Sequence, residues 1–317
     1  KSLALRKTIP FPAIFDVKWL PGLSDSRPTL VLACSDGTIR LVEVAFRYTD
    51  DDEAFDAEEM HVAEIIGRPP VLSISMATRE QKQSSASPHE KLEDYVLRFA
   101  SSYADHHVAL WEIVCTNEKS QGSRHHHRKW GLKELSRWRA HEIAEVWCVA
   151  FDPKHEDVLY SGGDDAKFKA WNTTSMKLLF ESSTHAGVCC IVPHPRFKNI
   201  LACGSYDGFL RIFECKSPHT NPKLTASLRL NSGIWQLKWH QKRDDILLAA
   251  CTTDGFKVVR VVNSTARVVG KYDGHRSLAY GCDWVPRENG DKRNMHDVAS
   301  CSFYDRALHI WSVEVPP

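Results

Sequence analysis

Six copies of one short pattern constrain the fold of this 317-residue chain more than any other feature. Each copy is an apolar run, a small polar turn that ends in Asp, and a second run with a large or apolar residue six positions after the Asp. Because each Asp separates two stretches of alternating character, such as Phe209-Leu-Arg-Ile-Phe213, we expect a tight hairpin between two strands at every copy. The pairs are Asp36 and Val42, Asp105 and Trp111, Asp165 and Trp171, Asp207 and Phe213, Asp254 and Arg260, Asp305 and Trp311.

A further alternating strand that ends in an aromatic residue precedes several of these hairpins. The clearest copies are Phe15-Asp-Val-Lys-Trp19, Trp147-Cys-Val-Ala-Phe151, Trp235-Gln-Leu-Lys-Trp239 and Tyr280-Gly-Cys-Asp-Trp284. The intervals between the Asp residues are 69, 60, 42, 47 and 51. The shortest matches the about 40 to 45 residues of a four-stranded blade in a WD-repeat β-propeller. We therefore predict an all-β WD-repeat β-propeller, one domain over residues 1–317, with six four-stranded blades visible.

Three polar insertions account for the longer intervals: residues 47–60, 79–94 and 116–130. Their composition predicts solvated loops. The third contains His125-His-His127, which resembles a metal-binding tract, but Arg124 and Arg128 flank it and favour a solvated insertion. We expect no metal here.

Ten cysteines are scattered through the chain without a C-x-x-C pair. Most lie inside apolar runs such as Leu201-Ala-Cys203, where cysteine acts as a small buried hydrophobic residue. The spacing argues against zinc and against a disulfide framework. We expect a reduced, metal-free protein.

Charge and hydropathy argue against several partner classes. The formal net charge is +1, so no basic field attracts nucleic acid or an anionic membrane. No apolar run approaches the about 20 residues that cross a bilayer, and Lys1 to Pro10 lacks a signal peptide's apolar stretch. We expect a cytoplasmic monomer without nucleic-acid or membrane partners.

Polar residues around each hairpin predict a hydrogen-bond ladder inside a blade. A His precedes the alternating strand in three copies, at His141, His185 and His275. Together with a Ser, the hairpin Asp and the Trp, as in Ser161, Asp165 and Trp171, such a His would satisfy buried polar groups. This role is preferred to a catalytic triad, and no Gly-x-Ser-x-Gly elbow is present.

Several stretches from about residue 140 to the end are more specific than a generic WD repeat: Tyr160-Ser-Gly-Gly-Asp-Asp165, Gly233-Ile-Trp-Gln-Leu-Lys-Trp-His240, Ser277-Leu-Ala-Tyr-Gly-Cys-Asp-Trp284 and Cys301-Ser-Phe-Tyr-Asp305. In these stretches the sequence resembles the WD-repeat family of diphthine methyl ester hydrolase, called diphthine methyltransferase in older naming. The first 135 residues match only loosely. This family is similar to a seven-bladed propeller with a blade before the segment that resembles Ile14 to Trp19, so the first blade is expected to be missing here. Alternatively, the strand-like Lys1-Ser-Leu-Ala-Leu-Arg6 closes a six-bladed ring.

The resemblance implies hydrolysis of the methyl ester of diphthine, the modified histidine of elongation factor 2, in diphthamide biosynthesis. Elongation factor 2 carrying methylated diphthine is then the partner, and no cofactor is implied. The alternative is a non-catalytic WD-repeat scaffold for protein binding, which the fold alone favours because architecture does not determine function.

The resemblance carries no catalytic motif, so candidate site residues come from the expected geometry. In a WD propeller the loop before the inner strand and the hairpin with the Asp open on one face, where their side chains converge. His185 and Asp164 are the catalytic candidates, because His titrates near neutral pH and a carboxylate can polarise it; the alternative for His185 is a ladder with Asp207. Aromatic faces can hold diphthine's trimethylammonium group, although the same rings could be propeller packing. The substrate-binding candidates are Tyr206, Trp235, Ser277, Tyr280 and Tyr304.

Overall fold

The structure is a computed structural model that describes residues 11–21, 28–43, 45–49, 52–56, 69–77, 95–119, 126–197, 199–217, 220–286 and 294–315. It divides into two compact units, Lys1–Val146 (unit 1) and Trp147–Pro317 (unit 2). The described residues form strands, turns and connecting segments with no helix, so the prediction of an all-β fold is confirmed. The prediction of a single domain stays a prediction.

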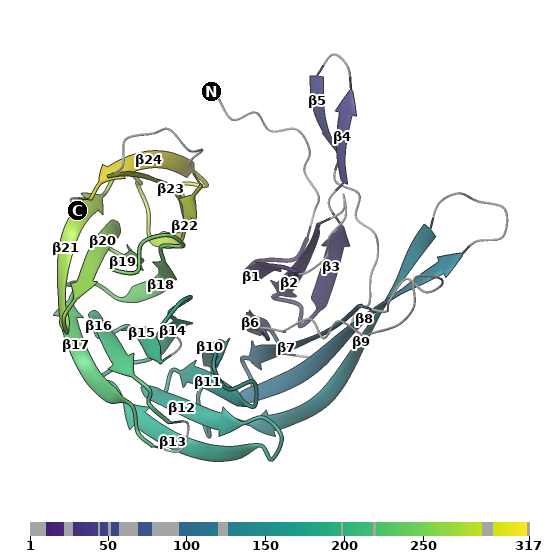
Figure 1. Cartoon of the computed structure of the whole chain (residues 1–317), viewed down its shortest axis with the longest axis horizontal. Coiled ribbons are helices and arrows are strands. Elements are labelled where there is room, and N and C mark those ends of the chain that lie inside the picture. The colour runs from purple at the N-terminus through teal and green to yellow at the C-terminus, as the bar shows by residue number, and fades with distance from the viewer. Residues whose placement is uncertain are drawn as a thin grey trace. The chain divides into compact units, whose positions relative to one another are not determined.

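Successive antiparallel blade sheets make up unit 2 (Figure 1). Three have four strands each, in the orders β10-β11-β12-β13, β14-β15-β16-β17 and β18-β19-β20-β21, and the last, β22-β23-β24, has three. The strands are β10 (Val146–Phe151), β11 (Val158–Gly163), β12 (Lys167–Asn172), β13 (Lys177–Ser183), β14 (Val188–Pro193), β15 (Ile200–Ser205), β16 (Phe209–Glu214), β17 (Lys223–Arg229), β18 (Ile234–Trp239), β19 (Ile246–Cys251), β20 (Phe256–Val262), β21 (Thr265–Tyr272), β22 (Ala279–Val285), β23 (Met295–Ser302) and β24 (Leu308–Glu314).

Unit 1 contains two blade sheets and a separate hairpin. Its first sheet has the three strands β1 (Ile14–Trp19), β2 (Thr29–Cys34) and β3 (Ile39–Glu43). The second has the four strands β6 (Val71–Met76), β7 (Tyr95–Tyr103), β8 (His107–Lys119) and β9 (His126–Arg139). The six predicted blades are confirmed, but two of them have three strands rather than four in the described part of the chain. The outer strand expected at Lys1 to Arg6 lies outside the described residues.

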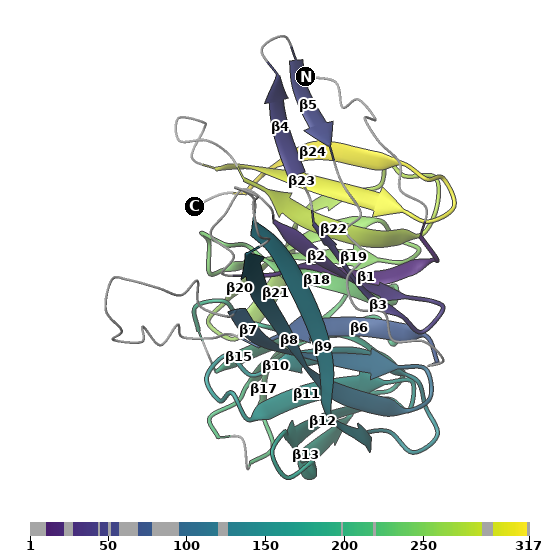
Figure 2. The ribbon, with the colours of Figure 1, turned by 90° about the vertical axis from the view of Figure 1, so that its right-hand side faces the viewer.

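Two of the three predicted loop insertions contain strands. Residues 45–49 and 52–56 form the hairpin β4 (Ala45–Thr49) and β5 (Asp52–Asp56). The expected loop 116–130 is largely an extension of β8 and β9, which pair as far as Lys119 opposite His126 and run side by side in Figure 2. Composition missed these ladders because backbone pairing does not require apolar side chains. The insertion 79–94 and His125 lie outside the described residues.

The predicted hairpin register is confirmed at all six Asp residues. Each lies between the second and third strands of its sheet, as Asp207 does between β15 and β16 and Asp305 between β23 and β24. The tight turn at Asp207 is completed by Gly208, whose φ of 78° lies in the left-handed region that glycine adopts without strain.

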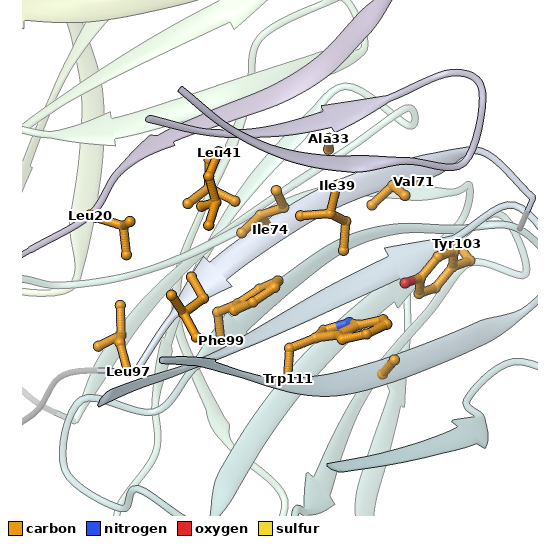
Figure 3. Close-up of a cluster of buried hydrophobic side chains, with 13 residues drawn as sticks. Leu20, Ala33, Ile39, Leu41, Val71, Ile74, Leu97, Phe99, Tyr103 and Trp111 are labelled. Atoms are coloured by element: carbon orange, nitrogen blue, oxygen red, sulfur yellow. The ribbon is translucent and has the colours of Figure 1, made fainter. Parts of the chain in front are cut away.

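Apolar faces of the strands pack into a core within each unit. In unit 1, Trp111, Phe99 and Ile74 lie in one buried cluster (Figure 3). In unit 2, residues of neighbouring blades share clusters, such as Phe168 of β12 with Phe213 of β16. Among the described residues, no helix has the length and apolarity that crossing a bilayer requires.

The third residue of several inner strands ties one blade to the next. In unit 1 the Asp16 carboxylate accepts a hydrogen bond from the Ile74 amide at 2.9 Å. In unit 2 the thiols of Cys148 and Cys190 lie 3.8 and 3.7 Å from carbonyl oxygens of the following inner strands. Gln236 does the same by accepting from the Cys282 amide at 2.6 Å.

The cysteines have the structural role that the sequence predicted. All ten are free and nine are buried, with Cys301 exposed. Burial raises the pKa of the Cys148 and Cys190 thiols well above the ordinary value. These two therefore stay protonated and donate weak hydrogen bonds between blades.

Candidate ligand site at the hairpin end of unit 2

The inner strands of unit 2 begin beside the hairpins that carry the Asp residues. Val188 of β14 pairs with Ser205, and Ala279 of β22 pairs with Ser302. We call this edge the hairpin end. Residues from the loop before each inner strand and from the hairpin meet here, as the sequence predicted.

A β-bulge follows the first residue of the inner strands β14, β18 and β22. The pairing register skips the second residue, which is Cys189, Trp235 or Tyr280. Trp147 is the second residue of β10. Because a bulge leaves one residue unpaired and re-aims its side chain, these positions can present rings at the hairpin end instead of into the sheet face.

Six aromatic rings form one continuous row at the hairpin end. Trp235 lies at its centre, with ring centroids 4.9 Å from Tyr280, 5.5 Å from Trp147 and 6.1 Å from Tyr206. Tyr206 also meets Trp147 edge-on at 5.1 Å. Beyond Tyr280 the row continues through Phe303, at 5.4 Å, to Tyr304, at 4.8 Å from Phe303. The structure therefore brings together the four aromatic residues predicted from sequence and adds Trp147 and Phe303.

Tyr206 enters the row because its neighbours are small. Its ring lies against Gly233, where an added Cβ would stand only 2.6 Å from Tyr206 Cδ1. In the blade that carries Tyr206, the bulged residue is Cys189 rather than a Trp or Tyr. Burial raises the pKa of Tyr206, and Cys189, Tyr280 and Asp164 raise it further, so the ring carries a neutral phenol.

The exposed end of the row is Phe303 and Tyr304, whose surfaces are 60% and 72% exposed. Ser277 holds this segment, because its hydroxyl accepts a hydrogen bond from the Tyr304 amide at 3.2 Å. Ser277 thus lies at the hairpin end with a contact that positions Tyr304, and its part in substrate binding stays a prediction.

His185 does not form the ladder with Asp207 that was its alternative role. Its backbone amide donates to Asp207 at 3.1 Å, while its side chain is exposed. The carboxylate of Asp207 is instead held by two hydrogen bonds from Arg211, at 3.1 and 2.7 Å. Burial acts to raise the pKa of Asp207, but hydrogen bonds from Arg211 and from the amides of Phe209 and His185 bring it below the ordinary value.

Asp164 is exposed in the hairpin between β11 and β12. Its carboxylate packs against Gly187, two residues after His185: a Cβ at Gly187 would stand 3.0 Å from Asp164 Oδ1. No hydrogen bond or ion pair joins Asp164 to His185 among the described residues. The two catalytic candidates therefore lie on adjacent loops with both side chains available to a ligand.

The residues of the predicted ladder lie together around Asp305. His275 Nε2 and Ser300 Oγ are 3.0 Å apart, Trp311 Nε1 donates to Ser300 at 3.0 Å, and His275 Nδ1 lies 3.4 Å from Asp305. Around Asp165 the Trp171 indole donates to Ser161 at 2.9 Å. At Asp254 a lysine, Lys257, takes the place of the His.

Sequence reasoning missed Trp147 and Phe303. Trp147 was visible in principle, because it occupies the same place in its strand as Trp235. Phe303 directly precedes Tyr304, but its ring contact with Tyr280 depends on hairpin geometry that spacing does not supply.

Comparison with known proteins supports the fold. The family described as WD domain, G-beta repeat matches residues 132–172 and 176–214. The crystal structure of the WD40 β-propeller domain of Doa1 is similar, with a TM-score of 0.59 and 17% identity over 96% of this chain and 83% of that chain. At this identity the likeness shows the fold alone.

Two curated proteins are similar in sequence. The diphthine methyltransferase homolog of Dictyostelium discoideum is 33% identical over 229 residues, which are 66% of this chain and 58% of that protein. The diphthine methyltransferase of Homo sapiens is 29% identical over 284 residues, which are 86% of this chain and 56% of that protein. The chain thus spans just over half the length of these relatives.

Proposed function

We propose that this protein hydrolyses the methyl ester of diphthine on elongation factor 2, a step of diphthamide biosynthesis. The observation that carries the proposal is the row of six aromatic rings at the hairpin end of unit 2. The similarity to proteins named diphthine methyltransferase supports the substrate. In the reaction, water adds to the ester carbonyl and the carbonyl–methoxy bond breaks, giving a carboxylate, methanol and a proton. No cofactor is required.

The aromatic row fits the cationic part of this substrate. Diphthine carries a trimethylammonium group beside its ester, and such a group binds over aromatic faces with about 0.5 to 2 kcal/mol per good contact. Trp235 and Tyr280 supply ring surface inside the row, and Tyr304 supplies it at the exposed end. The Asp164 carboxylate, close enough to raise the pKa of Tyr206, adds negative charge where the cation would lie.

His185 and Asp164 would serve the hydrolytic step. His185 accepts the proton of the attacking water, since its imidazole is exposed and a neutral imidazole can act as a general base. Asp164 lies on the adjacent loop, where its carboxylate polarises His185 and the attacking water. Their lack of mutual contact is compatible with the role, because catalytic hydrogen bonds often tighten only in the substrate complex.

The test is incubation of the purified protein with methyl-esterified elongation factor 2, followed by mass spectrometry for the loss of one CH₂ and by assay of released methanol. We expect loss of the methyl group with the unaltered protein and at least about a hundredfold slower loss with His185→Ala or Asp164→Asn. Glu156→Gln removes an exposed carboxylate from the loop between β10 and β11 and is the control; it should react at the normal rate.

Two outcomes would contradict parts of the proposal. Complete retention of the methyl ester with the unaltered, folded protein would reject the esterase function. Full activity in both His185→Ala and Asp164→Asn would reject the catalytic assignment and leave the function in place.

A protein-binding role without catalysis is the second candidate. The absence of a contact between His185 and Asp164 favours it, and so does the exposure of Phe303 and Tyr304. In that case methylated elongation factor 2 binds, binding weakens in Tyr304→Ala, and no methanol is released.

A further inference from the structure

We infer that Trp147 is a substrate-binding residue whose indole N–H donates a hydrogen bond to the carbonyl oxygen of the ester. This inference rests on the proposed function, because it concerns the same site. It adds a hydrogen-bond donor to the aromatic row, and it specifies the ligand as a quaternary ammonium compound with a neighbouring carbonyl group.

The indole N–H of Trp147 differs from those of four other tryptophans of unit 2. Its Nε1 is closed to solvent and has no acceptor in the described part of the chain. By contrast, each of the following indoles donates to a protein oxygen at 2.9 to 3.1 Å: Trp171, Trp239, Trp284 and Trp311. An unpaired buried donor costs about 1 to 3 kcal/mol, so an acceptor supplied by a ligand would recover that cost.

The position of Trp147 suits a ligand that binds in the aromatic row. Its ring contacts both Tyr206 and Trp235, so its N–H belongs to the group of rings proposed to hold the cation. In the substrate, the trimethylammonium nitrogen and the ester carbonyl are attached to the same carbon atom. A cation over Trp235 would therefore carry a carbonyl oxygen to within reach of a neighbouring ring.

Because Nε1 is closed to solvent, access to the N–H requires a movement, which we assign to Tyr206, whose ring meets Trp147 edge-on. Its side chain is 43% exposed and makes no hydrogen bond within the described residues. Turning the Tyr206 ring breaks its contacts with Trp147 and Trp235 but no hydrogen bond. Once the carbonyl is bound, the same N–H is placed to stabilise the negative charge that develops on its oxygen during attack by water.

A matched pair of stable ligands tests the inference. Acetonyltrimethylammonium has a carbonyl group beside the cation, whereas propyltrimethylammonium has the same carbon skeleton without the oxygen. Isothermal titration of the full chain should give a several-fold lower Kd for the acetonyl compound, the gain expected from one hydrogen bond. In Trp147→Phe, which keeps an aromatic ring but removes the N–H, the two Kd values should become equal.

Trp235→Phe is the matched control, since it changes a neighbouring ring of the same row and keeps the Trp147 indole N–H. It should weaken both ligands alike and preserve their ratio. The indole resonance of Trp147 gives an independent readout in the unaltered protein: it should move to lower field with the acetonyl compound and far less with the propyl compound.

The outcomes separate this inference from the function on which it rests. If both ligands bind and Trp147→Phe leaves their ratio unchanged, the hydrogen bond is wrong and the aromatic cage stands. If neither ligand binds the folded protein, the cage and the role of Trp147 both fall.

Discussion

The inner strands of unit 2 use the same residue types in opposite ways at their two ends. At the end away from the hairpins, the Trp239 and Trp284 indoles each donate to a carbonyl of the preceding blade at 3.1 Å. At the hairpin end, Trp147 has no acceptor in the described chain, and Tyr206 and Tyr304 are exposed. Aromatic residues that hold blades together therefore have their polar groups hydrogen-bonded within the protein, whereas those at the hairpin end are available to a ligand.

Polar side chains at the far end show the same structural regularity. Asp152, His194 and His240 each follow an inner strand and each accept hydrogen bonds from the amides two and three residues later. Each side chain closes the turn that leaves the inner strand. These histidines are therefore framework residues, whereas His185 at the other end has an exposed side chain.

Replacing one tryptophan at each end should give the largest difference between the two ends in unfolding free energy and in ligand binding. Trp284→Ala removes a buried ring and an interblade hydrogen bond, so we expect a loss of about 3 to 5 kcal/mol in unfolding free energy. Trp235→Ala removes a less buried ring and should cost less than about 2 kcal/mol. It should nevertheless weaken binding of a quaternary ammonium ligand. Urea unfolding measures the first effect and titration the second; equal stability losses would contradict the distinction between the ends.

Gly233→Ala should move one ring of the aromatic row, that of Tyr206. The added methyl group would stand 2.6 Å from Tyr206 Cδ1, so the ring must shift. We expect a cost of about 1 to 3 kcal/mol and weaker cation binding. Gly131→Ala is the control, because its nearest neighbour would be a carbonyl oxygen at 3.9 Å. Cation binding by Gly233→Ala that matched the unaltered protein would show that the position of Tyr206 is unimportant.

The far end should respond to acid through His240. Burial, His296 and the nearby Arg243 and Lys242 lower the pKa of His240 to about 4. Because the ordinary value of 6.5 applies to the unfolded chain, the unfolded state binds the extra proton first as pH falls. Stability should therefore be full above about pH 6.5 and decline towards pH 4, by on the order of 1 kcal/mol after allowance for solvent screening.

The control for this pH effect is His240→Asn, which keeps an acceptor for the turn amides without a titrating ring. Urea unfolding at several pH values should show a smaller decline for the variant between pH 6.5 and 4. Identical declines in both proteins would assign the effect to other groups.

Strand order and hairpin register were predictable because both depend on local pattern. A fixed offset from Asp165 to Trp171 repeats at Asp305 and Trp311, and alternation identifies the strands around them. The convergence of Tyr206, Trp235, Tyr280 and Tyr304 followed from that register.

Contacts between side chains were less predictable, because several partners compete for one group. Both His185 and Arg211 stood within reach of Asp207 in a blade, and only the geometry shows that Arg211 binds it on two nitrogens. The role of Trp147 was hidden for a similar reason. A sequence does not reveal whether an indole finds an acceptor across a blade.

The most direct test of the ligand site follows the indole N–H resonances of the protein during titration with propyltrimethylammonium. We predict that the resonances of Trp147 and Trp235 shift with the same saturation curve while those of Trp239 and Trp284 stay in place. Weaker shifts with Trp235→Phe would assign the cation to the row. Uniform small shifts of all four resonances, or saturable shifts only at Trp239 and Trp284, would contradict a cation site at the hairpin end.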